Sequence, residues 1–205
     1  MDATITCCAA VRPAQHRAER GFTLVEVMIA IAITGVAMLT MIGTFGAAMA
    51  ATQNAQNDLI AKQKALEALE SIFTARNTQQ IVFAQINNVS NGGIFTDGFT
   101  TLRAPGLDGL VGTGDDANYP GCPSGIECVT LPGPDGVLGA GGDDQQVSLA
   151  GFTRQILISP VMQPGVVPPT PNPNLRQITI NVQYFQNGQS APRTYTSTAL
   201  MSSYR

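Results

Sequence analysis

Residues 20–50 read RGFTLVEVMIAIAITGVAMLTMIGTFGAAMA, and this stretch decides the architecture of the chain. From Phe22 to Ala50 the only charged residue is Glu26. A hydrocarbon core of about 30 Å takes roughly 20 residues as a helix, so the run is long enough to cross a membrane. The three arginines before Phe22 outnumber the two carboxylates there, which keeps the N-terminus in the cytoplasm by the positive-inside rule. An ordinary secretory signal has its small-residue site after the apolar run, whereas here Gly21 precedes it.

The lone carboxylate of Glu26 lies near the start of this expected membrane helix. An acidic residue in a membrane helix costs roughly 2.5–3.5 kcal/mol on insertion scales, and it marks a functional site by default. The physics alone leaves two interpretations open. In one, Glu26 sits at interface depth and is hydrated; in the other, it needs a partner inside the membrane.

The residues around Glu26 form a recognisable pattern. Residues 20–26, RGFTLVE, place a Gly before the apolar run, a Phe at its start and a Glu four residues after the Phe. This junction resembles the leader junction of type IV prepilins and type II secretion pseudopilins. The resemblance covers the leader and the first helix closely, and the rest of the chain only by architecture.

The resemblance implies a set of roles for Gly21, Phe22 and Glu26. A prepilin peptidase and N-methyltransferase would remove a cytoplasmic leader, residues 1–21, and methylate the new amine of Phe22. Glu26 would then pair with the Phe22 amine of a neighbouring subunit, which removes much of the cost of a carboxylate in lipid and fixes the helix register. Residues 22–50 would form the transmembrane and filament-core helix, in the bacterial inner membrane first and later in a periplasmic or cell-surface filament for adhesion, motility or secretion.

The helix is expected to continue beyond the membrane through residues 51–76, which contain neither Pro nor Gly. A stripe of large apolar residues follows helical spacing there and predicts the face that packs on a domain; its members are Leu59, Leu66, Leu69 and Phe73. Three glycines in the first half either let that half bend in a filament or serve close helix packing: Gly35, Gly43 and Gly46.

Residues 77–205 are expected to form a small antiparallel β domain. Strands are predicted for 152–159, for 175–185, where apolar and polar residues alternate, and for 193–204. Asn187-Gly188 supplies a turn, and the proline-rich residues 160–173 are interpreted as a linker. A long helix on an antiparallel sheet gives an α+β fold of pilin type, most similar to minor pilins of the V class and I-type pseudopilins.

Residues 104–146 form a Gly/Pro/Asp-rich insertion with two similar segments. Residues 106–116 (GLDGLVGTGDD) and 133–144 (GPDGVLGAGGDD) each combine an Asp-Gly turn, an apolar pair and two final aspartates. Clustered carboxylates on a tightly turning chain suit Ca²⁺, although the spacing matches neither an EF-hand nor a nonapeptide calcium repeat. Two interpretations remain open: solvated turns, or calcium loops with Asp108, Asp115, Asp116, Asp135, Asp143 and Asp144 as ligands.

The four cysteines come in two pairs. Cys7 and Cys8 are adjacent, and neighbouring cysteines rarely bond each other because the geometry is strained. Cys122 and Cys128 enclose a short loop that would close as a disulfide in an oxidising compartment, the alternative being two free thiols.

Composition argues against several function classes. The formal net charge of -3 offers no basic field for nucleic acid. The only histidine, His16, lies in the expected leader, so Ser-His and Cys-His catalysis are unavailable to a processed chain. We therefore expect no enzyme and no required cofactor. The partners are expected to be other pilin or pseudopilin subunits, the processing enzyme and inner-membrane lipid. The alternative is an unprocessed, membrane-anchored binding protein that displays an acidic domain outside the cytoplasm.

Overall fold

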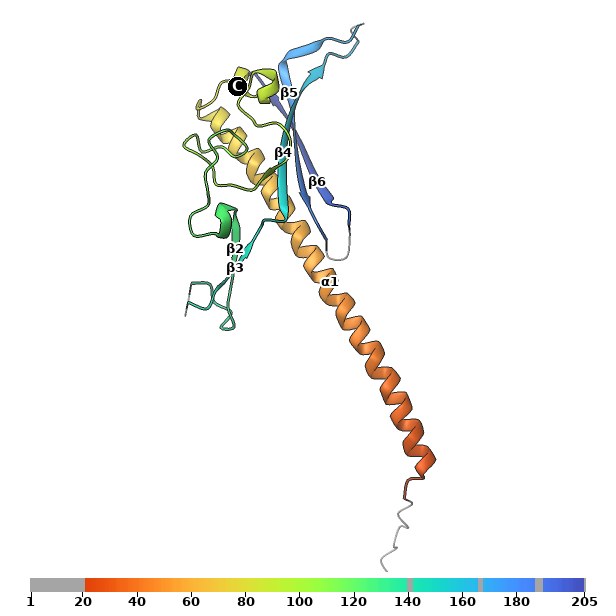
Figure 1. The fold of residues 1–205 in the computed structure, drawn as a ribbon. Helices are drawn as coiled ribbons and strands as arrows, with labels where there is room; N and C mark the ends of the chain where they lie inside the picture. The colour runs from red at the N-terminus through yellow and green to blue at the C-terminus, as the bar shows by residue number, and fades with distance from the viewer. Residues whose placement is uncertain (1–20, 140–141, 166–167, 187–189, 205) are drawn as a thin grey trace, which may run out of the picture. The chain divides into compact units, whose positions relative to one another are not determined.

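A computed structural model describes residues 21–139, 142–165, 168–186 and 190–204 of the chain. The expected leader, with Cys7, Cys8 and His16, lies outside the described residues apart from Gly21, and so does the Asn187-Gly188 turn. The chain divides into two compact units, residues 1–48 and 49–205. Helix α1 (Leu24–Asn77) contributes to both of them (Figure 1).

In the first unit, residues 24–48 are helical and every one of them is exposed. Large apolar side chains dominate this exposed surface, among them Leu24, Ile31 and Leu39. One 18-residue window of α1 reaches a mean hydropathy of 2.2, so the helix is long and apolar enough to cross a membrane by length and composition. Such a surface is incompatible with water as its working solvent and needs lipid or other helices around it.

The second unit holds an antiparallel sheet of four strands in the order β1-β4-β5-β6. Between α1 and the last three strands lie short 3₁₀ turns and a separate two-stranded sheet, β2-β3. The strands are β1 (Thr100–Thr101), β2 (Cys128–Leu131), β3 (Gln145–Ser148), β4 (Phe152–Met162), β5 (Pro171–Tyr184) and β6 (Arg193–Ser202). The predicted α+β class is confirmed.

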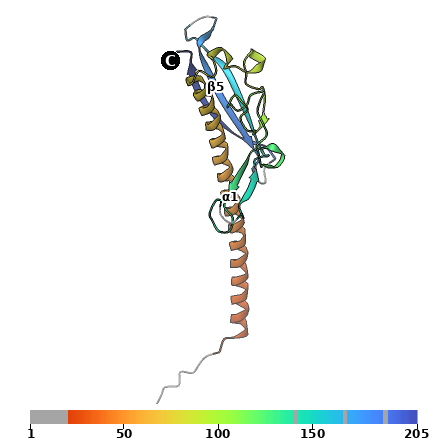
Figure 2. The same cartoon turned by 90° about the vertical axis from the view of Figure 1, so that its left-hand side faces the viewer.

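The second half of α1 packs against one face of the four-stranded sheet (Figure 2). The register places Ile156 opposite Ile180 and Ile158 opposite Ile178, so the apolar residues of β4 and β5 share this face. The helix contributes a face made mostly of small side chains, which let its backbone approach the sheet closely: Ala61, Ala65, Ala68, Leu69, Ile72 and Ala75, all buried.

The predicted leucine stripe of α1 is therefore wrong in part. Leu69 is buried, and Phe73 packs at the border of the core, but Leu59 and Leu66 remain 56% and 41% exposed. Leucine is the stronger hydrophobic signal in the sequence, yet the alanine face is the one that fits against the sheet. The two leucines are left on the outer surface of the helix.

The two edges of the sheet differ. On the β4 edge, β1 pairs with Thr153 and Arg154, and beyond that point the side-chain amide of Asn88 replaces a strand. Asn88 Nδ2 donates to the Ile156 carbonyl at 2.7 Å, and its Oδ1 accepts the Ile158 N–H at 2.8 Å. On the other side, β6 is the last strand of the sheet.

Two further expectations need correction. The proline-rich residues are not a plain linker, because β4 extends to Met162 and β5 begins at Pro171. Pro160 is tolerated because β4 has no strand neighbour on its outer side there. The insertion also contains the β2–β3 pair, in which Cys128 lies opposite Ser148; no strand was predicted there.

Candidate functional site

The start of α1 holds the predicted processing and assembly residues. Thr23 precedes the helix, and its hydroxyl accepts the backbone N–H of Glu26 at 3.3 Å. Thr23 and Glu26 thus have the spacing of a capping box, in which a Thr caps the helix three residues before a Glu. The carboxylate lies in the first turn, where the helix dipole favours negative charge. Sequence reasoning missed this structural role of Thr23, although the T-x-x-E spacing was available to find it.

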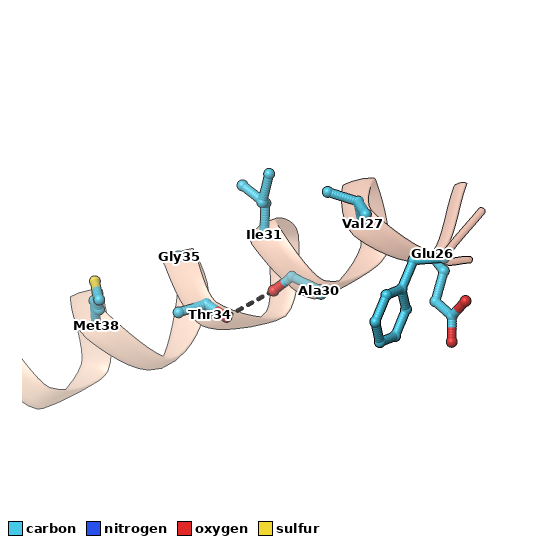
Figure 3. Close-up of a pocket in the computed structure, with 8 residues that line it drawn as sticks. Glu26, Val27, Ala30, Ile31, Thr34, Gly35 and Met38 are labelled. Carbon is cyan, nitrogen blue, oxygen red and sulfur yellow. Dashed lines mark hydrogen bonds between the residues drawn. The ribbon is translucent and has the colours of Figure 1, made fainter. Parts of the chain in front are cut away.

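One face of the first unit forms a shallow apolar groove that begins at Glu26 (Figure 3). The only hydroxyl on this face, that of Thr34, donates to the Ala30 carbonyl at 2.7 Å, so it is satisfied within the helix. Gly35 adds no side chain, and the helix backbone is open to close approach there. The residues lining the groove are Phe22, Glu26, Val27, Ala30, Ile31, Thr34, Gly35 and Met38.

The Glu26 carboxylate points away from this helix (Figure 3). Among the described residues, none forms an ion pair with it. A single carboxylate at the end of an apolar groove can accept a cation from another molecule, and pairing there is strongly favoured once water is excluded.

In the second unit, Cys122 and Cys128 are joined in a disulfide with a Cα–Cα distance of 5.7 Å. The bond closes a short ring around the turn at 123–125 and ends at the first residue of β2. Glu127, the residue before Cys128, is buried and its backbone N–H donates to the Leu102 carbonyl at 3.0 Å. The ring therefore holds a buried carboxylate at a fixed place beside α1.

Glu127 belongs to a buried group of charged side chains that the sequence did not reveal. Lys64 of α1 pairs with Glu127 and, at 2.6 Å, with Glu67. Burial acts to lower the pKa of Lys64, but the hydrogen bonds from its ammonium group to these two carboxylates raise it overall. Arg154 of β4 is buried nearby, and burial lowers its pKa despite the favourable charges of Glu67 and Asp116. Charged side chains from α1, the insertion and β4, which are far apart in the sequence, therefore interact with one another.

The two Gly/Asp segments fold alike. In the first, Asp108 Oδ1 accepts the Leu110 N–H at 2.8 Å; in the second, Asp135 Oδ1 accepts the Val137 N–H at 2.9 Å. The final aspartates also correspond, because Asp116 accepts from Gly112 at 2.8 Å and Asp144 accepts from Gly139 at 2.7 Å. The sequence repeat is therefore also a structural repeat, and these four aspartates hold the backbone of their own loop.

The remaining aspartates, Asp115 and Asp143, lie against the first glycine of each loop. A Cβ at Gly106 would collide with the Asp115 carboxylate, and one at Gly133 would collide with that of Asp143. The Thr113 hydroxyl donates to Asp115 at 2.7 Å and lowers the pKa of that exposed carboxyl. Burial raises the pKa of Asp116, partly offset by the N–H groups of Gly112 and Thr113.

As a calcium site, the six aspartates give a mixed result. Within the described residues, no three His, Cys, Asp or Glu side chains are grouped closely enough to hold a metal ion. Asp143 Oδ1 and Asp144 Oδ1, however, are buried oxygens that accept no hydrogen bond from the part of the chain that the structure describes. Unpaired buried carboxylate oxygens are unfavourable and fit a cation ligand. The second loop is therefore the better candidate.

Comparison with known protein families identifies one segment of the chain. Residues 16–50 match the family described as the prokaryotic N-terminal methylation motif, which is the prepilin-cleavage signal of type IV pilins and pseudopilins. The match spans the cleavage junction and the exposed apolar half of α1. No curated protein and no solved structure matches the chain.

Proposed function

We propose that this chain, which carries the prepilin-cleavage signal, is a structural subunit of a type IV pilus-like filament, either a minor pilin or a pseudopilin. The observation that carries the proposal is the coincidence of that signal with the apolar first half of α1, residues 24–48, in which every residue is exposed. Such a helix suits membrane anchoring before assembly and helix packing afterwards. The signal marks structural rather than catalytic proteins, in line with a chain that is not an enzyme.

In this proposal, prepilin peptidase cleaves between Gly21 and Phe22 and the new Phe22 amine is methylated. The amine stays cationic after methylation and becomes the partner of Glu26 in a neighbouring subunit. Two observations support this pairing: the carboxylate ends an apolar groove, and it has no ion-pair partner among the described residues. A pair of this kind fixes the axial register between neighbouring helices.

Maturation provides the direct test. We expect mass spectrometry of the membrane-bound protein to find methylated Phe22 as the N-terminus and no residue before it. Replacing Gly21 with a bulky residue should leave the precursor uncut, while the same change at Gly35, which is also exposed, should not affect cleavage. Intact Met1 on most of the assembled protein would overturn the filament proposal.

The second candidate function is an unprocessed, membrane-anchored binding protein with an acidic domain. The aspartates of the insertion favour this second function, because some of them, Asp115 and Asp135 among them, are exposed. Such an anchor would keep its leader, so the maturation test separates the two functions.

We also propose that the Gly/Asp loops bind Ca²⁺, as a structural ion and not a required cofactor. Calcium should raise the melting temperature of the oxidised full-length protein in detergent, and chelator should reverse the gain. The stabilisation follows mass action, about 2.7 kcal/mol at a hundredfold excess over the dissociation constant. Mg²⁺ should substitute poorly because it demands a tighter octahedral site.

Variants assign the calcium effect to particular loops. Asp143→Ala with Asp144→Ala should remove most of the calcium-dependent gain, because these residues carry the unpaired oxygens. Asp97→Ala, which removes a carboxylate outside both loops, should leave the gain intact. A melting temperature indifferent to calcium at matched ionic strength would leave the loops as solvated turns.

A further inference from the structure

The open edge of the four-stranded sheet borders a groove. Among the described strands, none pairs with β6 on its outer side, whereas the β4 edge is covered by β1 and by the Asn88 amide. From Thr194 to Ser202, β6 carries no charged residue and no proline. Natural sheets protect long open edges with such residues, so an unprotected edge indicates a binding surface.

The groove lies between β6 and the flank of α1. Asp58, Leu59 and Lys62 of the helix line it together with Arg193 and Tyr195 of the strand. Asp58 accepts the hydroxyl of Tyr184 and pairs with Arg193 at 3.5 Å. Lys62 and Arg193 therefore outnumber the one carboxylate of the lining, and the groove carries a net positive charge. A separate hollow lies where Phe73 and Arg76 face the last residues of β6.

Apolar surface accompanies this positive charge. Leu59 lines the groove and is 56% exposed, and Leu66 is also exposed on α1, seven residues further along. Leu200 of β6 is also exposed. A basic groove with exposed leucines fits a partner that offers carboxylates together with apolar side chains.

Residues 128–148, which comprise β2, β3 and their connection and are called the β2–β3 arm here, have that chemistry in the same chain. Between Arg103 and Arg154 there is no Lys or Arg, and the arm carries Asp135, Asp143 and Asp144. Its exposed apolar residues are Leu131, Val137, Leu138 and Val147. Leu138 is 60% exposed, and exposed apolar side chains that lie close together on an arm are typical of a surface that binds a partner.

The arm and the groove are on opposite flanks of α1. Lys64 faces the insertion through Glu127, whereas Lys62 lines the groove with β6. Figure 1 shows β2 and β3 on one side of the helix and β6 on the other. The arm and the groove of one chain therefore lie apart, which leaves the groove open to the arm of a neighbouring copy.

We propose that the acidic β2–β3 arm of one copy docks in the basic groove between α1 and β6 of a second copy. The contact is heterologous, because two different surfaces meet, and repeated heterologous contacts build a filament unless the rotation closes a ring. The proposal rests on the proposed function only in requiring that copies meet in the membrane or in a filament.

Cysteine cross-linking between full-length copies tests this contact. Two differently tagged chains, both with Cys7→Ser and Cys8→Ser, are co-expressed; one carries Lys62→Cys and the other Val137→Cys. Mild oxidation should give a mixed-tag dimer. The matched control replaces Val137→Cys with Val89→Cys, because Val89 and Val137 are both 55% exposed but only Val137 is on the arm. The control yield should be severalfold lower.

Charge reversal gives an independent measurement. With the cross-link moved to Leu59→Cys, Lys62→Glu and Arg193→Glu should reduce the mixed-tag dimer severalfold, and Asp135→Lys in the partner chain should restore part of it. The N-terminal mass of each sample is measured alongside. Processed chains that cross-link equally through Val89 and Val137 would overturn the docking and leave the proposed function standing. Unprocessed chains that still cross-link through Val137 would overturn the function and leave the docking.

Discussion

Replacing Glu26 with Gln should nearly abolish entry of the chain into filaments while leaving it in the membrane. A hydrogen bond to a charged group contributes about 1.5–3 kcal/mol, roughly a ten- to hundredfold change in association. Removing the charge lowers the cost of insertion, so the amount in the membrane should stay equal or rise. The ratio of filament to membrane protein, measured by quantitative blotting after shearing, reports the effect. Glu26→Ala should behave in the same way.

The capping geometry at the start of α1 makes the comparison sharper. Glutamine also serves in a capping box, so Glu26→Gln removes the charge and keeps the helix start. Thr23→Ala does the reverse: it removes the hydroxyl that accepts the Glu26 N–H, a loss of about 1 kcal/mol, and keeps the carboxylate. Thr23→Ala should therefore assemble almost normally. A loss in Thr23→Ala as large as that in Glu26→Gln would show that assembly depends on the helix start as much as on the charge, and wild-type assembly of Glu26→Gln would refute the pairing.

Lys64→Met should destabilise the protein by about 3–5 kcal/mol, because it leaves the buried Glu127 carboxylate without its cation. Urea unfolding of the full chain in detergent, followed by circular dichroism, measures this loss. Lys62→Met is the matched control two residues earlier on the same helix, where the side chain is exposed, and its effect should stay within about 0.5 kcal/mol.

The double variant separates charge pairing from packing. Lys64→Met combined with Glu127→Met should recover most of the loss, since a buried ion pair can be replaced by apolar side chains at little cost. The pKa of Lys64 is raised in the folded state, so its contribution to stability is complete below the ordinary value of 10.5. It is lost as pH rises through the raised value. A double variant as unstable as Lys64→Met would show that packing, and not charge, dominates there.

The elements with strong periodicity could be predicted from the sequence. The apolar run and the absence of Pro or Gly after Gly46 led to one long helix, and α1 extends from Leu24 to Asn77. The alternation in residues 175–185 predicted a strand with Ile178, Ile180 and Val182 on one face, and all three are buried. A sequence pattern predicts a helix or strand well where many successive side chains fit the same regular spacing of buried and exposed positions.

Features that depend on distant contacts could not be predicted in this way. Lys64 and Glu127 are 63 residues apart, and nothing in either neighbourhood marks them as partners. The Asn88 amide completes a sheet edge 68 residues away, in a segment that reads as irregular. The alanine face of α1 was overlooked because burial depends on the fit between helix and sheet, and hydrophobicity alone favoured Leu59 and Leu66.

The disulfide between Cys122 and Cys128 also has a consequence for when the second unit reaches its final structure. Under the proposed topology these thiols leave a reducing cytoplasm, where they stay open, and join only after the domain has been exported. Because Glu127 lies within the ring that this disulfide closes, oxidation after export would restrict the loop that holds the partner of Lys64. In the proposed topology, the newly made precursor and the exported subunit would therefore differ in the freedom of this loop as well as in the leader.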